Sequence, residues 1–366
     1  MEKQFKIPRE ISIGGNSVEK ILIGAKNPVT IQTMWKEGIV GVKDDFSRMD
    51  SILEKIAQLK TLGCNIIRFA VPDEKSAESF VEICKRTSVP LVADIHFDYR
   101  LALKCLEGPV AAIRINPGNI GARERVQAVV SGCKEKGVAI RIGVNSGSLP
   151  HDLADAVENG KISRATALCE TAARESAVFD ELGFDQFIVS MKASSVQETI
   201  DSNEEFARKY DIPLHIGVTE AGPLITGVVK STLAFSHLLR EGIGSTIRVS
   251  LSSSPENEVV AGLEILRECG LRKGGVTLVS CPRCGRLGFD VHGFMEKWQN
   301  ELLSMKKDIT VAVMGCVVNG PGEGKHADIG IAGAGEKVII FRKGKIVRTV
   351  DAQDADTEFR KELQSL

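Results

Sequence analysis

The sequence predicts an α/β fold, a (β/α)8 TIM barrel followed by a small α+β domain, and three observations lead to this prediction. Short β-rich runs alternate with amphipathic helical stretches eight times between about residues 29 and 270. Eight such units in ~240 residues match the usual size of a (β/α)8 barrel. No Gly-x-Gly-x-x-Gly motif follows the first strand, which disfavours the alternative of an open, doubly wound sheet.

The barrel elements follow one another regularly along the chain. Within residues 1–28, alternating apolar positions at Ile11–Ile13 and Val18–Ile23 predict a hairpin that closes the bottom of the barrel. The eight predicted strands are Val29–Met34, Asn65–Val71, Pro90–His96, Ala112–Pro117, Ala139–Asn145, Gln186–Lys192, Pro213–Thr219 and Ser245–Leu251. The predicted helices include Asp45–Leu62, Ala122–Glu135, Ser163–Leu182 and Ser254–Cys269. Strands that alternate with helices are expected to pair in parallel through right-handed crossovers.

The eightfold pattern stops after Gly274-Gly275, so we expect a barrel domain over residues 1–272 and a second domain over residues 273–366. The second domain is predicted to contain helices near Asp290–Lys306 and Thr357–Leu366. Its predicted strands are Ile309–Met314, Asp328–Ile331, Lys337–Phe341 and Lys345–Val350. This order of elements indicates a small α+β domain.

Alternate residues of the barrel strands differ sharply in polarity. One set is apolar, for example Ile67, Phe69 and Val71, and is expected to face the helices. The other set should face the lumen, and its polar members are Arg68, Asp94, His96, Arg114, Asn116, Arg141, Asn145, Ser190, Lys192, His215, Thr219, Arg248 and Ser250. Burying so many unpaired polar groups is unfavourable, so the mouth of the lumen is expected to hold water or a ligand.

Five cations in the lumen-facing set indicate an anionic ligand. Arginine binds phosphate oxygens through two parallel hydrogen bonds, so this cluster favours a phosphorylated or diphosphorylated molecule. The alternative is an internal ion-pair network with Asp94 and Glu220, but two acids leave an excess of positive charge. Asp94, His96 and Glu220 are then candidates for proton transfer or for holding substrate hydroxyl groups.

Composition disfavours nucleic acid and membranes as partners. Lys plus Arg (47) and Asp plus Glu (48) give a net charge of −1, and only 5% of the residues are aromatic. No apolar run reaches ~18 residues, and Met1–Pro8 has no hydrophobic signal-peptide segment. We therefore expect a cytoplasmic protein.

Nine cysteines in a large chain without an export signal do not indicate a disulfide framework. Six of them are scattered singly among apolar residues and are predicted to be buried hydrophobes: Cys64, Cys84, Cys105, Cys133, Cys169 and Cys269. The other three, Cys281, Cys284 and Cys316, lie close to Gly and Pro in the last quarter of the chain.

Cys281-Pro-Arg-Cys284-Gly has the pattern of a metal-binding knuckle. A structural zinc ribbon uses this knuckle but needs a second ligand pair, and only Cys316 follows. His292 or His326 would complete a mixed site, but neither has the regular spacing from a partner.

Three cysteines without a fourth suit a cubane iron–sulfur cluster in which one iron is not held by thiolate. Glu323 lies seven residues after Cys316 in a Gly-Pro-Gly loop and is a candidate to cap that iron. Spacing alone does not distinguish this glutamate from other acids in loops.

Two longer motifs carry a family resemblance. Cys281-Pro-Arg-Cys-Gly-Arg286 followed by Gly315-Cys-Val-Val-Asn-Gly-Pro-Gly-Glu323 closely resembles the short bacterial form of the 4-hydroxy-3-methylbut-2-en-1-yl diphosphate synthase family. The likeness continues through the barrel motifs Ile31-Gln-Thr-Met34, Ile67-Arg-Phe-Ala-Val-Pro72, Ala93-Asp-Ile-His96, Ile113-Arg-Ile-Asn-Pro-Gly118, Ile142-Gly-Val-Asn-Ser-Gly147, Ser190-Met-Lys-Ala193, Gly217-Val-Thr-Glu-Ala-Gly222 and Ile247-Arg-Val-Ser250.

The resemblance implies an iron–sulfur oxidoreductase of the methylerythritol phosphate route to isoprenoids. Such an enzyme opens the ring of 2-C-methyl-D-erythritol 2,4-cyclodiphosphate with two electrons and eliminates water, which gives (E)-4-hydroxy-3-methylbut-2-enyl diphosphate. The resemblance also implies a [4Fe–4S] cluster and reduced flavodoxin or ferredoxin as the electron donor. It further implies a head-to-tail homodimer in which the cluster domain of one chain caps the barrel of the other.

Roles for individual residues also follow from the resemblance. Cys281, Cys284 and Cys316 match the thiolate ligands of the cluster, and Glu323 matches a carboxylate ligand that is displaced during catalysis. Glu220 is expected to contact substrate and to handle a proton. The expected substrate-binding residues are Arg68, Asp94, His96, Arg114, Asn116, Arg141, Asn145, Lys192, Arg248 and Ser250.

Two alternatives belong to other classes of protein. The first is a barrel enzyme with structural zinc in its small domain, in which Asp94, His96 and Lys192 carry out aldol or pterin-linked chemistry on a phosphorylated ligand. The second is a non-catalytic module whose zinc knuckle contacts nucleic acid or a partner protein. The balanced charge and scarce aromatic residues argue against nucleic acid, and this alternative leaves the polar lumen unexplained.

Overall fold

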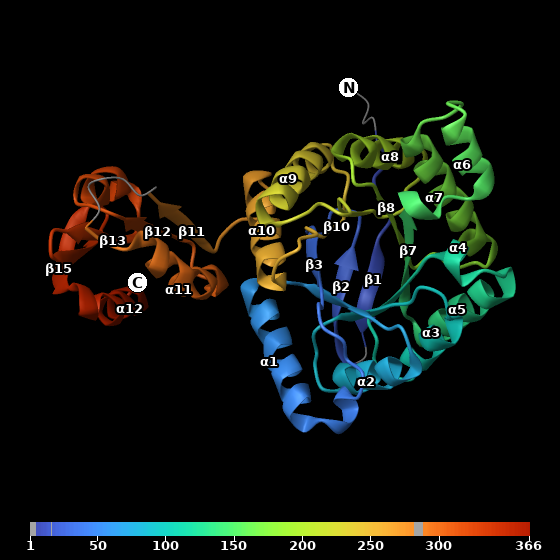
Figure 1. Cartoon of the computed structure of the whole chain (residues 1–366), viewed down its shortest axis with the longest axis horizontal. Coiled ribbons are helices and arrows are strands. Elements are labelled where there is room, and N and C mark those ends of the chain that lie inside the picture. Colours follow the sequence, from blue (N-terminus) through green and yellow to red (C-terminus); the bar gives the residue numbers. More distant parts are fainter. Residues whose placement is uncertain (1–4, 16, 282–287) are drawn as a thin grey trace. The chain divides into compact units, whose positions relative to one another are not determined.

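The computed structural model describes residues 5–15, 17–281 and 288–366, and it divides the chain into two compact units. The first unit comprises Met1–Arg272 and the second Lys273–Leu366. Each unit is described by itself below, and Figure 1 identifies the elements by label and colour.

The first unit is a closed barrel of eight parallel strands with helices around it (Figure 1). Neighbouring strands follow the order β8-β7-β6-β5-β4-β3-β10-β9, and a parallel bridge between Val189 and Leu214 joins the two ends. The strands are β3 (Thr30–Met34), β4 (Ile66–Ala70), β5 (Leu91–Asp94), β6 (Ala112–Ile115), β7 (Ala139–Asn145), β8 (Phe187–Lys192), β9 (His215–Ile216) and β10 (Thr246–Ile247). The predicted (β/α)8 barrel is confirmed.

The last two barrel strands are shorter than their predicted seven residues. Each has only two residues in the regular ladder, although the amide of Arg248 still donates to the carbonyl of Ile216 at 3.1 Å. The backbone directly after β10 therefore keeps partial pairing with β9.

Helices surround the strands and begin at side chains that cap their free N–H groups. The carboxylate of Asp45 accepts from the amide of Arg48, and the hydroxyls of Ser163 and Ser254 act in the same way at later helices. The helices of this unit are α1 (Phe46–Leu62), α2 (Glu74–Lys85), α3 (Tyr99–Cys105), α4 (Pro117–Ile120), α5 (Arg123–Lys136), α6 (His151–Glu158), α7 (Arg164–Glu181), α8 (Val196–Lys209), α9 (Leu224–Arg240) and α10 (Pro255–Glu268), with the single turns η1 (Val42–Asp44) and η2 (Ser146–Ser148). Over the described part of the chain, every helix is too short or too polar to cross a lipid bilayer.

The hairpin of β1 (Ile11–Gly15) and β2 (Val18–Ile23) seals the amino-terminal end of the barrel. Its buried side chains pack against the first inward-facing residues of the strands, including Ile66 and Ala139. The amide of Gly14 also donates to the carbonyl of Ala111 at 3.2 Å. The lowest layer of the lumen is therefore apolar and closed, and the polar side chains lie above it.

The second unit is a five-stranded mixed sheet. The strand order is β11-β12-β13-β14-β15, in which β12 is parallel to β11 and β13 and the last two pairs are antiparallel. Its elements are β11 (Val276–Ser280), α11 (Val291–Ser304), β12 (Ile309–Met314), η3 (Val318–Gly322), η4 (Glu323–His326), β13 (Ile329–Ala334), β14 (Lys337–Arg342), β15 (Lys345–Asp351), η5 (Ala352–Asp354) and α12 (Ala355–Gln364). Strand β11 was not expected, because its half-exposed residues do not alternate in polarity.

Both faces of this sheet are covered. One face packs on α11 and α12 through Trp298 and Phe359, whose ring centroids lie 5.2 Å apart in an edge-to-face arrangement. On the other face, Phe341 is fully buried with Ala312 and Met314 beneath the segment that follows Cys316.

We predict that Gly330→Ala destabilises the second unit by about 1–3 kcal/mol, because the added methyl group would overlap the buried ring of Phe341. Denaturant unfolding followed by Trp298 fluorescence, in a Trp35→Phe background, measures this effect. Gly322→Ala is the matched control, since its methyl group would meet nothing within 4 Å. Equal stability of the two variants would contradict the predicted overlap.

Candidate active site

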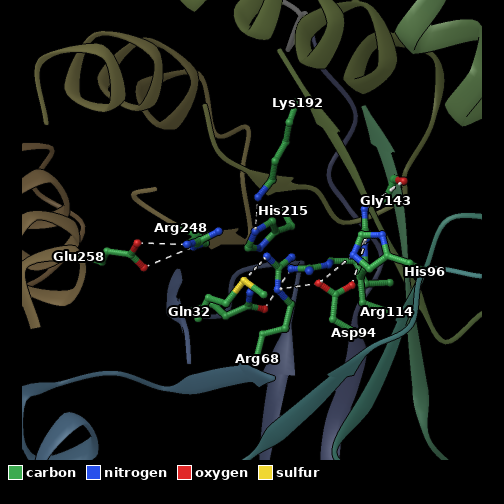
Figure 2. A network of polar contacts seen from close by, with 12 residues as sticks. Gln32, Arg68, Asp94, His96, Arg114, Gly143, Lys192, His215, Arg248 and Glu258 are labelled. Carbon is green, nitrogen blue, oxygen red and sulfur yellow. Dashed lines mark hydrogen bonds and ion pairs between the residues drawn. The ribbon is translucent and has the colours of Figure 1, made fainter. Parts of the chain in front are cut away.

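Five cationic side chains meet inside the barrel, as the strand pattern predicts. Arg68, Arg114, Arg141 and Lys192 come from four strands, β4, β6, β7 and β8, and Arg248 follows β10 directly. The first four residues are at most 9% exposed, and the side chain of Arg248 is 12% exposed. Figure 2 shows four of these cations converging, with Lys192 above, Arg248 on the left, Arg68 below and Arg114 on the right.

Asp94 on β5 is the counter-charge for two of these cations. Its carboxylate accepts a 3.0 Å hydrogen bond from Arg114 and lies 3.4 Å from Nε of Arg68 (Figure 2). Burial alone would raise the pKa of Asp94, but the charges of Arg68 and Arg114 and a contact with His96 hold that pKa well below its usual range. Asp94 is therefore ionised at neutral pH. Burial also lowers the pKa of Arg68 to about 10, so its guanidinium stays charged.

Glu258 on α10 is the second buried carboxylate, and the sequence analysis did not identify it. It accepts from Arg248 at 3.0 Å, Lys36 at 2.6 Å, Thr33 at 2.7 Å and the amide of Leu251 at 3.0 Å. Burial would raise the pKa of Glu258, but the charge of Arg248 and these hydrogen bonds lower it. Glu220, the second acid in the alternative of an internal ion-pair network, is exposed and forms no ion pair within the described residues. Glu258 is instead the second acid that pairs with the cations.

Glycines inside the strands make room for two of the cations. A side chain at Gly143 would overlap the guanidinium of Arg114, and one at Gly217 would lie 2.9 Å from Nζ of Lys192. A glycine within a strand or at its end commonly marks the close approach of another group. The sequence could therefore have predicted that a side chain packs against each of these two positions.

Lys192 contacts an imidazole instead of a carboxylate. Its Nζ lies 3.1 Å from Nε2 of His215 (Figure 2). Nδ1 of His215 lies 2.6 Å from Oγ1 of Thr246. His215 is completely buried. It belongs to the predicted lumen-facing set, but only the structure shows its contact with Lys192.

The remaining predicted binding residues lie near the carboxyl ends of the strands. Asn116 donates to Ser148 at 2.9 Å and is buried, while Asn145 and Ser250 are half-buried. The His96 side chain is 49% exposed and lies 3.6 Å from Asp94. Glu220 lies on an exposed turn with a φ of 51°, a left-handed conformation that is uncommon for residues other than glycine. These residues form a polar rim above the cations.

The predicted metal ligands lie in the second unit. Cys281 follows β11 and Cys316 follows β12, which are adjacent parallel strands, so both thiols lie at the same edge of the sheet. The sulfur of Cys281 accepts a hydrogen bond from the amide of Gly315 at 3.0 Å. Cys284 and the side chain of Glu323 lie outside the described residues, and within those that are described no three metal-ligating side chains gather.

The single cysteines agree with their predicted structural role. Cys64, Cys84, Cys105, Cys133 and Cys169 are buried, and Cys269 is half-buried. Burial raises the pKa of Cys64 and Cys105 to about 12, which keeps both thiols protonated and unreactive.

We predict that Asp94→Asn lowers the free energy of unfolding by about 3–5 kcal/mol at neutral pH, because it leaves two buried arginines without a counter-charge. The folded pKa of Asp94 is below the ~3.9 of an unfolded chain, so its stabilisation is complete above that value and is lost as the pH falls further. Urea unfolding at several pH values should show the difference from wild type shrinking in acid.

Glu181→Gln is the control for this experiment, because its ion pair with Arg123 is exposed and should contribute little. An Asp94→Asn variant as stable as the wild type at neutral pH would show that Asp94 does not balance the arginines.

Comparisons with known proteins find matches along nearly the whole chain. Residues 15–263 match the family model described as the GcpE TIM-barrel domain, and residues 277–365 match the GcpE protein C-terminal domain. A protein of Treponema pallidum is 58% identical over 98% of this chain and 92% of its own length, and one of Treponema denticola is 55% identical over 99% of both chains. Both relatives are named 4-hydroxy-3-methylbut-2-en-1-yl diphosphate synthase (flavodoxin). With both of its units matched, the chain belongs to the GcpE family.

Proposed function

We propose that this chain converts 2-C-methyl-D-erythritol 2,4-cyclodiphosphate to (E)-4-hydroxy-3-methylbut-2-enyl diphosphate and that the cations of the barrel bind the diphosphate. The main support for this proposal is a set of buried N–H donors in the lumen that have no hydrogen-bond acceptor within the described residues. Nε and Nη2 of Arg141, Nε of Arg114 and Nε2 of Gln32 are buried and have no acceptor within the described residues. Buried N–H groups without acceptors are costly, and phosphate oxygens would satisfy them with charge-assisted hydrogen bonds.

The cations are held in place before substrate binds. Asp94 fixes Arg114 and Arg68 from one side, and Glu258 fixes Arg248 from the other. Two carboxylates cannot neutralise even the four arginines, which leaves positive charge for the two phosphates. Restricting these side chains in advance reduces the entropy lost on binding.

The rim residues are suited to the organic part of the substrate. Asn116, Asn145 and Ser250 supply neutral hydrogen-bonding groups, and His96 and Asp94 would hold hydroxyl groups. Glu220 is an exposed acid that follows β9, and we assign it a role in proton transfer.

The second unit would hold a [4Fe–4S] cluster through Cys281, Cys284, Cys316 and Glu323. Two observations fit this group: Cys281 and Cys316 lie at the ends of adjacent strands, and Cys281 already accepts a backbone N–H bond of the kind that tunes cluster thiolates. When bound, the cluster would supply the two electrons of the reaction.

The names of the relatives indicate flavodoxin as the donor, and we propose the same donor for this chain. We also propose a cytoplasmic location and a head-to-tail homodimer that brings a cluster domain to each barrel mouth. Sedimentation analysis of the purified protein tests for the dimer.

The first test is the metal content of protein purified without oxygen. About four iron and four sulfide per chain would support the cluster, whereas one zinc without sulfide would contradict it. An assay with cyclodiphosphate and reduced flavodoxin should then yield the linear diphosphate. Cluster-loaded protein that consumes no cyclodiphosphate would refute the proposed reaction.

We predict that two substitutions separate substrate binding from chemistry. Arg141→Gln should raise KM about 30-fold or more, equivalent to ~2 kcal/mol, because it removes a buried charge that faces phosphate. Glu220→Gln should lower kcat by about 10²–10⁴-fold with little change in KM, as expected for loss of proton transfer. Steady-state kinetics on variants with equal iron content measure both effects. The reverse pattern would contradict these assignments.

A further inference from the structure

Lys192 combines two features that none of the other four cations combines. Asp94 pairs with Arg68 and Arg114, and Glu258 pairs with Arg248, but Lys192 contacts no carboxylate within the described residues. Arg141 also has no carboxylate partner and donates to Gln32 at 3.0 Å. A guanidinium keeps its proton in proteins, whereas a lysine amine can lose it. Lys192 is therefore the member of the cluster whose charge can change.

The surroundings of Lys192 disfavour its positive charge. Four arginines face it from other strands: Arg68, Arg114, Arg141 and Arg248. His215 faces it from β9, and the two buried acids of the site, Asp94 and Glu258, are already paired with arginines. Burial and the charges of the four arginines lower the pKa of Lys192 well below its usual range. Burial and the charge of Lys192 do the same to the pKa of His215.

The contact with His215 serves both protonation states of Lys192. When the lysine is charged, it donates to Nε2, and the Nδ1–H group of the imidazole donates to Thr246. When the lysine is neutral, it accepts from an Nε2–H group, and Nδ1 accepts from the Thr246 hydroxyl. Both arrangements use the same 3.1 Å and 2.6 Å contacts and differ only in the tautomer of the imidazole.

We propose that Lys192 is uncharged in the empty barrel and takes up a proton from solvent when the anionic substrate binds, while His215 changes tautomer. This inference rests on the proposed binding of the cyclodiphosphate at the cations. The two phosphates would offset the field of the arginines, so that the ammonium form becomes favourable again. Affinity is then coupled to pH: binding weakens as the pH rises, by up to about tenfold per unit.

Calorimetric titration of the oxidised holoenzyme with the cyclodiphosphate, without reductant, tests the proposal. Each phosphorus of the cyclic diphosphate carries one acidic oxygen that stays ionised near neutral pH, so the ligand itself takes up no proton. The dependence of the binding heat on the ionisation heat of the buffer gives the number of protons exchanged. We expect an uptake of about 0.5–1 proton per ligand at neutral pH.

Three variants test which residue takes up this proton. Lys192→Arg keeps the positive charge but has no neutral state, so it should bind ligand with no proton uptake. Lys36→Arg is the matched control, because Lys36 already pairs with Glu258 and should leave the uptake unchanged. His215→Gln should retain uptake if the proton goes to Lys192.

The outcomes distinguish this inference from the proposed function. No binding by the wild type would refute the proposed function. Binding without proton uptake, or unchanged uptake in Lys192→Arg, would refute the role of Lys192 and leave the proposed function standing. Loss of proton uptake only in His215→Gln would show that His215, and not Lys192, takes up the proton. This outcome would also overturn the inference.

Discussion

The interior of the barrel contains more positive charge than its own carboxylates balance, and much of the first unit is arranged around this constraint. The lumen of a (β/α)8 barrel is usually filled by branched apolar side chains. Here only the lowest layer is apolar, and the hairpin of β1 and β2 seals it. Above that layer, buried charges interact strongly because little water screens them. Asp94 and Glu258 are therefore essential neighbours, since each holds arginines in a fixed position.

The same charge imbalance links stability to function. A cluster that was fully neutralised would be more stable but would have little affinity for a diphosphate. The excess cations raise the energy of the folded barrel, and under the proposed function a dianionic ligand would lower it. The carboxyl ends of the strands supply neutral and acidic groups around this centre, so the proposed function would put charge recognition deep in the lumen and proton transfer toward its mouth. The second unit independently places Cys281 and Cys316 at the ends of adjacent strands.

Much of this site could be predicted from the sequence because strand residues alternate between two faces. That rule, applied to eight strands, correctly placed all five cations and Asp94 in the lumen. It could not identify Glu258, which reaches the lumen from α10. Glu258 lies on the same buried face of α10 as Ala261 and Ile265. In the sequence, however, it cannot be distinguished from an acid on the surface of the helix until the packing of that helix is known. The same limit explains why the alternative of an internal ion-pair network named Glu220, and not Glu258, as its second acid.

The sequence by itself determined the barrel, the order of its strands, the inward direction of the cations and the motifs that relate the chain to a family. These features depend on local periodicity and on short spacings, which the chain carries along its length. Only the tertiary structure decided which polar side chains contact each other, because these contacts form through packing between separate elements. The pairs are Arg248 with Glu258, Lys192 with His215, and Arg141 with Gln32. It also decided which cations, Lys192 and Arg141, have no carboxylate partner within the described residues. That outcome depends on the distances between all the buried charges together, and no single segment of the sequence contains it.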